Sequence, residues 1–194
     1  MECAKRTTEV EHYGPGVAHL AISAIGSDRP GIVAAVSGVL VRLGCNLEDT
    51  SMSLLRGHFA MMLVVSGPDD LAAELLEQDL SAATADLGLL VAVRAIDDEV
   101  PAGPPGELWT VSVYGADQPG IVHRVTTLLA EEGANIADLT TRVIGDPARP
   151  VYAMILDVTV PPGVDGGELV ARLSTLAGEL GVECSAHRSE ADIL

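Results

Sequence analysis

Two short stretches of the sequence carry the same polar turn. The segment GSDRPGIV at residues 26–33 recurs as GADQPGIV at residues 115–122. In each copy an aspartate, Asp28 or Asp117, stands two positions before a Pro-Gly pair that opens an apolar helical pattern. The start of a helix presents free N–H groups and the positive end of its dipole, which attract a carboxylate, and the aspartate can accept hydrogen bonds from an ammonium group. An amino acid carries both groups.

An asparagine follows each turn at the same spacing, at Asn46 and Asn135. Its amide both donates and accepts hydrogen bonds. A bare helix start beside an aspartate and an asparagine is therefore complementary to an α-amino acid. Pro30 and Pro119 suit the first turn of a helix, where a missing N–H costs nothing. Gly31 and Gly120 leave that helix start uncovered, so that another group can approach the backbone.

A purely structural interpretation of the turns stays open. An aspartate before a proline-containing helix start is a common N-cap, which stabilises a helix by about 1 kcal/mol. Gly31 would then only allow close packing, and Asn46 would fix the turn after Gly44. Asp49 and Asp138 also repeat, and we expect them on a solvated or interface surface, since charged residues are rarely buried. His123, in the first turn of its helix, is a weaker ligand candidate.

The repeat extends over most of the chain. The second copy lies 89 residues after the first, and four extra residues near 145–150 indicate a longer hairpin. Apolar alternation and helical spacing predict strand, helix, strand, strand, helix, strand in each copy. The expected ranges are 20–25, 32–43, 46–54, 59–65, 71–87 and 89–96, then 109–113, 121–129, 135–143, 152–160, 169–180 and 182–188.

This order is that of the ferredoxin-like βαββαβ motif. The predicted fold class is α+β, with two such domains, each a four-stranded antiparallel sheet with two helices on one face. We expect an N-terminal extension at 1–16, a first domain at 17–97, a linker at 98–106, a second domain at 107–189 and a tail at 190–194. Because a domain of this size buries only a modest core, we also expect a homodimer.

Charge excludes several functions. The chain of 194 residues carries 28 Asp and Glu against 11 Lys and Arg, a formal net charge of −17. Phosphate backbones and anionic membranes need a basic footprint, so we expect no direct nucleic-acid or membrane binding. No spanning segment or signal peptide is apparent. Three scattered cysteines form no disulfide framework, which favours a reduced, cytoplasmic location.

Signatures of catalysis are missing from the sequence. It contains no G-x-S-x-G, P-loop or dinucleotide-binding motif, and its five histidines show no metal-ligand spacing. We therefore predict no catalytic residues, no metal and no cofactor. Since the two repeats consume the chain, no length remains for a catalytic domain, and we expect the protein not to be an enzyme.

The two turns, each followed by Gly-x-Asn at the helix exit, resemble tandem ACT domains, over roughly residues 17–97 and 107–189. The resemblance is closest to double-ACT proteins of the glycine cleavage system transcriptional repressor type, which are regulators. ACT domains commonly bind small amino acids at domain interfaces through this motif. Carried over by motif, the implied ligand-binding residues are Asp28, Pro30, Gly31, Ile32 and Asn46, with Asp117, Pro119, Gly120, Ile121 and Asn135 in the second copy.

The resulting hypothesis is a non-enzymatic regulator that binds a small amino acid, with glycine or serine as candidates. Ligand binding would shift its association with a transcription factor or a metabolic enzyme. Such a shift requires that the ligand has different affinities for two states of the protein. The alternative is a ligand-free interaction or oligomerisation module in which both turns are only caps.

Overall fold

The fold is taken from a computed structural model that describes residues 17–97, 105–146 and 149–189. The described chain forms two compact units, one within residues 1–100 and the other within residues 101–194. The expected extension at 1–16, most of the linker at 98–106 and the tail at 190–194 lie outside the described residues.

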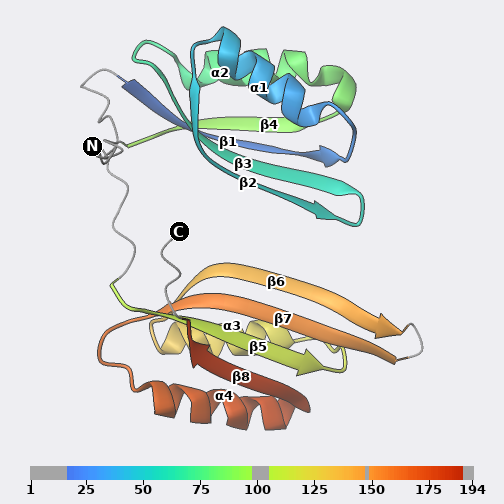
Figure 1. Cartoon of the computed structure of the whole chain (residues 1–194), viewed down its shortest axis with the longest axis vertical. Coiled ribbons are helices and arrows are strands. Elements are labelled where there is room, and N and C mark those ends of the chain that lie inside the picture. Colours follow the sequence, from blue (N-terminus) through green and yellow to red (C-terminus); the bar gives the residue numbers. More distant parts are fainter. Residues whose placement is uncertain (1–16, 98–104, 147–148, 190–194) are drawn as a thin grey trace, which may run out of the picture. The chain divides into compact units, whose positions relative to one another are not determined.

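Within residues 17–97, the first unit contains four strands, two α-helices and one short 3-10 helix (Figure 1). Their order along the chain is β1 (Val17–Ser27), α1 (Ile32–Arg42), β2 (Asn46–Leu55), β3 (His58–Pro68), α2 (Ala73–Ala83), η1 (Ala85–Leu87) and β4 (Leu90–Ile96). The strands pair antiparallel in the order β2-β3-β1-β4.

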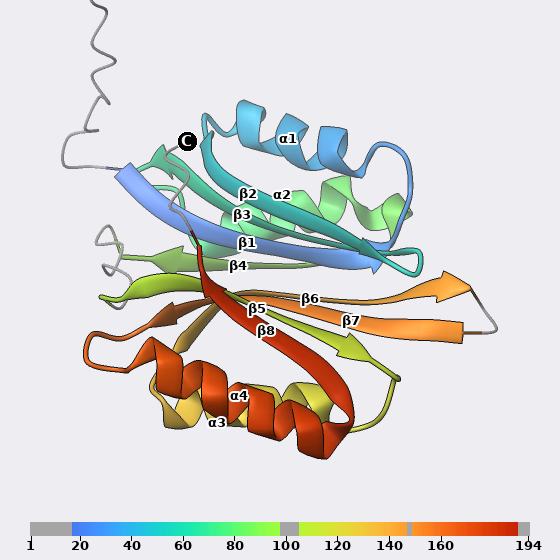
Figure 2. The ribbon, with the colours of Figure 1, turned by 60° about the horizontal axis from the view of Figure 1, so that its bottom comes forward.

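The second unit repeats this plan without a 3-10 helix among its described residues. Its elements are β5 (Glu107–Gly115), α3 (Ile121–Glu131), β6 (Asn135–Asp146), β7 (Arg149–Val160), α4 (Gly166–Leu180) and β8 (Val182–Arg188). The strands pair in the order β6-β7-β5-β8. In each unit both α-helices cover one face of the sheet (Figure 2). The predicted α+β class and βαββαβ order are confirmed.

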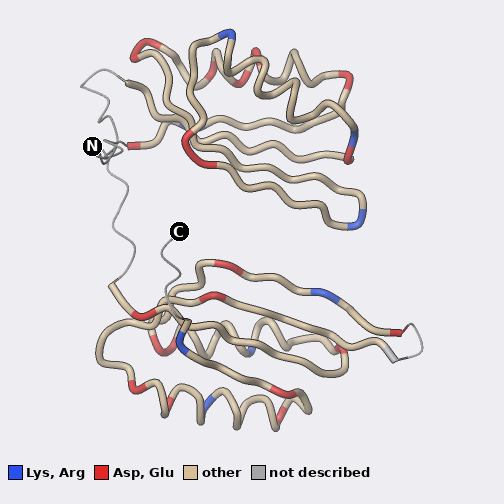
Figure 3. The backbone as a smooth tube through the Cα atoms, viewed as in Figure 1, with Lys and Arg blue, Asp and Glu red and all other residues tan. Residues whose placement is uncertain are grey.

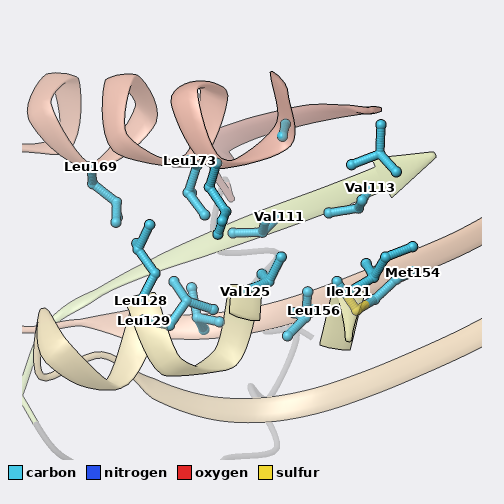
Figure 4. Packing of buried hydrophobic residues seen from close by; sticks show 14 of the residues in the cluster. Val111, Val113, Ile121, Val125, Leu128, Leu129, Met154, Leu156, Leu169 and Leu173 are labelled. Carbon is cyan, nitrogen blue, oxygen red and sulfur yellow. The ribbon is translucent and has the colours of Figure 1, made fainter. Parts of the chain in front are cut away.

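Apolar side chains alternate along the strands, and those on the helix-covered face of each sheet form the core. Val111 and Val113 of β5 are fully buried, as are Met154 and Leu156 of β7. They pack against the apolar stripes of α3 and α4 (Figure 4). The continuously apolar segments β3 and β7 are the interior strands of their sheets, because each is paired on both sides. Burial on one face thus fixes the register of the whole sheet.

The end of the second helix departs from the prediction. The predicted helix covers 71–87, but α2 ends at Ala83, which is exposed, and η1 follows. Thr84 is buried instead, and its hydroxyl donates to the carbonyl of Leu80 at 2.8 Å. That bond satisfies the buried hydroxyl, which a count of apolar residues does not reveal.

Ion pairs join the two helices in each unit, and one of them has its charges reversed between the units; Arg124 and Glu179 form another pair between the helices of the second unit. In the first unit Arg42 of α1 lies 3.7 Å from Asp79 of α2. At the matching positions of the second unit, Glu131 of α3 pairs with Arg172 of α4 at 3.0 Å. Arg172 also pairs with Glu132. The Arg42–Asp79 and Glu131–Arg172 pairs are solvent-exposed, so each contributes only about 0–1 kcal/mol to stability.

The capping of the second helix also differs between the units. Asp165, the N-cap of α4, accepts hydrogen bonds from the N–H groups of Gly167 at 2.7 Å and Glu168 at 3.1 Å. Its counterpart at α2 is Ala72, which has the same extended backbone but cannot cap.

We therefore expect Asp165→Ala to destabilise the second unit by about 1 kcal/mol and Ala72→Asp to stabilise the first by a similar amount. Urea denaturation of the two variants and the wild type measures both changes. Equal signs for the two variants would contradict the assignment of Asp165 as the cap.

Candidate functional site

Glycine, not aspartate, caps the helices at the repeated turns. We call residues 28–31 turn 1 and residues 117–120 turn 2. The N-caps of α1 and α3 are Gly31 (φ 95°) and Gly120 (φ 99°), and no side chain caps either helix. The alternative in which Asp28 and Asp117 act as N-caps is therefore wrong. Pro30 and Pro119 precede the caps and so lie outside the first helical turn where they were expected.

Each capping glycine is required by its backbone conformation. Positive φ is costly for residues with a Cβ. A Cβ at Gly31 or Gly120 would meet no atom of the rest of the described chain within 4 Å, so close packing does not explain either glycine. The space around the Cβ position of both glycines is open.

Backbone donors without a partner in the helix lie at both helix starts. The first hydrogen bond of α1 is donated by the Ala35 N–H to the Gly31 carbonyl at 2.9 Å, and Arg124 and Gly120 make the same bond in α3. The N–H groups that precede Ala35 and Arg124 in each helix have no acceptor within the helix. They are available to an anionic group such as a carboxylate.

The isoleucines of the motif belong to the cores. Ile32 and Ile121 are each 2% exposed, and both pack in the hydrophobic clusters. Their side chains cannot contact a ligand at the turns, so only their backbone N–H groups remain as candidates. Asp28 and Asp117 are exposed beside the helix starts.

Neighbouring segments hold both turns in place. The Asp28 N–H donates to the Gly57 carbonyl at 3.0 Å, which ties turn 1 to the β2–β3 hairpin. The Arg29 guanidinium donates to the Asp86 carbonyl at 3.1 Å. In turn 2, the Gln118 amide donates to the carbonyl of Leu180 at the end of α4. Arg29 and Gln118, which differ in sequence, thus perform the same positioning role.

The asparagines lie at the opposite end of each sheet from the turns. In the register of β1 and β3, Ser27 pairs with His58 next to turn 1, whereas His19 pairs with Ser66. Asn46 pairs with the same Ser66. The two rows are eight residues apart, about 26 Å along the strand. Asn135, which pairs with Thr159, occupies the matching place in the second sheet. One unit therefore does not bring its aspartate and asparagine together.

Two hydroxyls that the sequence interpretation overlooked lie beside turn 2. Tyr152 of β7 pairs with Gly115, just before the turn, and its side chain hydrogen-bonds to that of Thr141. Burial raises the pKa of Tyr152, and the charge of Asp117 raises it further, while the Thr141 bond lowers it. Asp117 thus lies close enough to act on the phenol. The sequence indicates this difference between the units, because Tyr152 stands at the position where the first unit has Phe59.

Cys45 and Cys184, the two cysteines within the described residues, are poor candidates for nucleophiles. Burial raises the pKa of the Cys45 and Cys184 thiols, which disfavours the nucleophilic thiolate.

Acidic residues outnumber basic ones in both units (Figure 3). None of the helices described is long and apolar enough to cross a membrane.

Comparison with known families identifies the repeat. The model of the ACT domain matches residues 18–94, and a second ACT-domain model matches residues 109–172. The chain is also 30% identical over 183 residues to the glycine cleavage system transcriptional repressor of Escherichia coli, covering 92% of this chain and 91% of that protein. The chain belongs to the tandem ACT-domain family. The resemblance to the glycine cleavage repressors seen in the sequence is thereby confirmed.

Two further relatives of this ACT protein show the same duplication in different settings. Phosphoserine phosphatase SerB2 of Mycobacterium tuberculosis is 32% identical over 85% of this chain, which covers only 40% of that enzyme. A crystal structure of an unknown protein from Galdieria sulphuraria superposes with a TM-score of 0.77 at 31% identity, covering 90% of this chain and 99% of that one. The tandem ACT unit thus occurs both as nearly a whole protein and as part of an enzyme.

Proposed function

We propose that the chain is a non-enzymatic, cytoplasmic regulatory protein that binds a small amino acid, glycine or serine, at turns 1 and 2. Its ACT domains are taken as residues 17–97 and 107–189. The observation that carries the proposal is the pair of helix starts without a side-chain cap. Each has N–H groups with no acceptor in the helix, a capping glycine with free space around its Cβ position and an exposed aspartate. Membership of the ACT family, and the name of the Escherichia coli relative, support a regulatory role and glycine as a ligand.

The chemistry of the turns matches both ends of an amino acid. The N–H groups at the start of α1 or α3 would hold the carboxylate, because they have no acceptor in the helix. Asp28 or Asp117 would accept hydrogen bonds from the ammonium group. Such charge-assisted bonds are stronger than bonds between neutral groups.

The positions of the asparagines limit how ACT units can associate around a shared ligand. Since Asn46 lies at the far end of the sheet from turn 1, a ligand held by both residue types must be shared by two ACT units, of one chain or of two. We accordingly propose a homodimer. Regulation would follow if the ligand changed how this assembly meets a partner protein, such as a transcription factor or a metabolic enzyme. With a net charge of −17, direct binding to nucleic acid is not part of the proposal.

Isothermal titration calorimetry with glycine and serine tests the proposal. Asp28→Asn and Asp117→Asn keep the side-chain shape and remove only the charge, so each should weaken one site about tenfold or more. Asp70→Asn, an exposed carboxylate just after the end of β3, at the end of the sheet opposite turn 1 in the first unit, is the matched control and should leave binding at turn 1 unchanged.

Two results would contradict the amino-acid site. One is no heat with either amino acid at millimolar concentration, which leaves the ligand-free interaction module. The other is binding by the Asp28→Asn/Asp117→Asn double variant as tight as that of the wild type.

A further inference from the structure

The outer edge of strand β8 carries backbone groups that its sheet leaves unpaired. β8 is the last strand in the order β6-β7-β5-β8, so only one of its edges is paired (Figure 2). The Ser189 N–H donates to the Leu108 carbonyl at 2.9 Å, and bonded and non-bonded residues alternate along an antiparallel strand. Every second residue of β8 therefore directs its N–H and carbonyl away from β5, namely Val182, Cys184, Ala186 and Arg188.

The first unit closes the matching edge with a carboxylate. Val93 of β4 occupies the position of Ala186, since these two pair with the matching residues Ile22 and Val111. The Val93 N–H donates to the Glu77 carboxylate of α2 at 2.9 Å, which occupies the outer edge of β4. A charge set against an edge strand is one way in which proteins prevent pairing with another strand.

The second unit lacks this carboxylate. Val170 of α4 stands where α2 has Glu77, one residue after a buried leucine in each helix. Within residues 105–146 and 149–189, no acceptor is found for the Ala186 N–H. A groove of about 710 Å³ borders this edge, and Asp165, the one acid that lines it, is engaged in capping α4. The edge of β8 is therefore open to a further strand.

The side chains along β8 complement a second copy of the same strand. An antiparallel pairing about a two-fold axis at Ser185 engages every residue of β8 and joins its outward-facing residues to each other. Glu183 of one copy then lies opposite His187 of the other, at two places by symmetry. The imidazole can donate to the carboxylate, and complementary cross-strand pairs stabilise a sheet. Any other register leaves part of β8 unpaired and sets Glu183 opposite a different residue.

We propose that two chains associate through β8, so that two four-stranded sheets join into one continuous antiparallel sheet. The first unit takes no part in this contact, because Glu77 occupies the edge of β4. This inference rests on the homodimer of the proposed function and names its surface. Its residues lie outside turns 1 and 2.

Analytical ultracentrifugation of the full chain measures the dissociation constant of the dimer. Val170→Glu gives the second unit the carboxylate that closes the first, and it should raise this constant about tenfold or more. Ala171→Glu is the matched control, because Ala171 lines the groove between α3 and α4 instead of the one beside β8. It adds the same charge and should leave the constant unchanged.

Exchange of Glu183 and His187 tests the register. His187→Glu sets like charges opposite each other at two symmetric places and should weaken the dimer about tenfold or more. Glu183→His, added to that variant, reverses each pair and should restore the wild-type constant. Both side chains are exposed, and circular dichroism checks that every variant is folded.

Cysteine cross-linking gives an independent measurement. In a chain whose three native cysteines are replaced by serine, Ser185→Cys sets two thiols opposite each other at the two-fold axis. Oxidation should then yield a covalent dimer on a non-reducing gel. Ala92→Cys is the matched control, because Ala92 pairs with Ser23 as Ser185 pairs with Ser112, and it should remain a single chain.

The outcomes separate this interface from the amino-acid site. A wild-type chain that stays monomeric at millimolar concentration overturns both the β8 contact and the homodimer. A dimer that is unaffected by Val170→Glu and by His187→Glu overturns the β8 contact alone, and so does a failure of Glu183→His to restore the dimer. Calorimetry with glycine and serine judges the turns separately, since none of these substitutions lies in them.

Discussion

Leu76→Ala is expected to lower the free energy of unfolding of the first ACT unit by about 2–5 kcal/mol. Leu76 of α2 is fully buried among the residues of the first core. Removing three carbons there leaves a cavity, because the packed strands beneath the helix cannot collapse to fill it. Few substitutions in this chain should have a larger effect on stability.

The neighbouring Leu75 supplies the matched control. It lies on the same helix but is 48% exposed, so Leu75→Ala should change stability by well under half as much. Urea denaturation followed by circular dichroism measures the total change, and hydrogen exchange in residues 17–97 assigns it to the first unit. Equal losses for the two variants would refute the placement of Leu76 in the core.

Gly166→Ala is expected to destabilise the second ACT unit by about 1–3 kcal/mol through overpacking. A Cβ at this first residue of α4 would lie 2.5 Å from both Cη2 and Cζ2 of Trp109. The indole is rigid and only 8% exposed, so either the ring or the start of the helix must move.

A second glycine of the same helix should give the opposite sign. Gly178→Ala adds a Cβ with no neighbour within 4 Å and improves helix propensity, so it should stabilise the unit by about 0.5–1 kcal/mol. Trp109 is the single tryptophan of the chain, and its fluorescence during urea denaturation reports both variants. A neutral Gly166→Ala variant with an unchanged emission spectrum would show that the ring tolerates the methyl group.

Repetition made the fold predictable from the sequence. A strand, a helix start and a glycine at the helix exit each recur in the second copy, and Gly44 and Gly133 both adopt the expected left-handed conformation with φ 70°. A pattern that is weak in one copy becomes informative when it recurs at the matching position of the other, because few other assignments of strands and helices fit both copies. The end of α2 was harder to predict, because a buried hydroxyl such as Thr84 depends on a hydrogen bond that hydrophobicity does not report.

The site was predictable in its parts but not in its geometry. Asp28 and Asn46 are separated by one helix, and the eleven residues of α1 carry the chain about 16 Å towards the other end of the sheet. The spacing of the motif along the sequence does not show this distance in the fold. The alternative in which Asp28 and Asp117 are N-caps is wrong because a glycine with positive φ can begin a helix without any side-chain partner.

The reversed ion pairs between the helices bear on how a duplicated chain avoids errors in folding. Repeats with similar elements can exchange them and trap misassembled states. A helix pair formed from α1 and α4 would set Arg42 against Arg172, and one formed from α3 and α2 would set Glu131 against Asp79. Each correct pair attracts and each exchanged pair repels, so weak surface charges that add little stability still discriminate between the repeats.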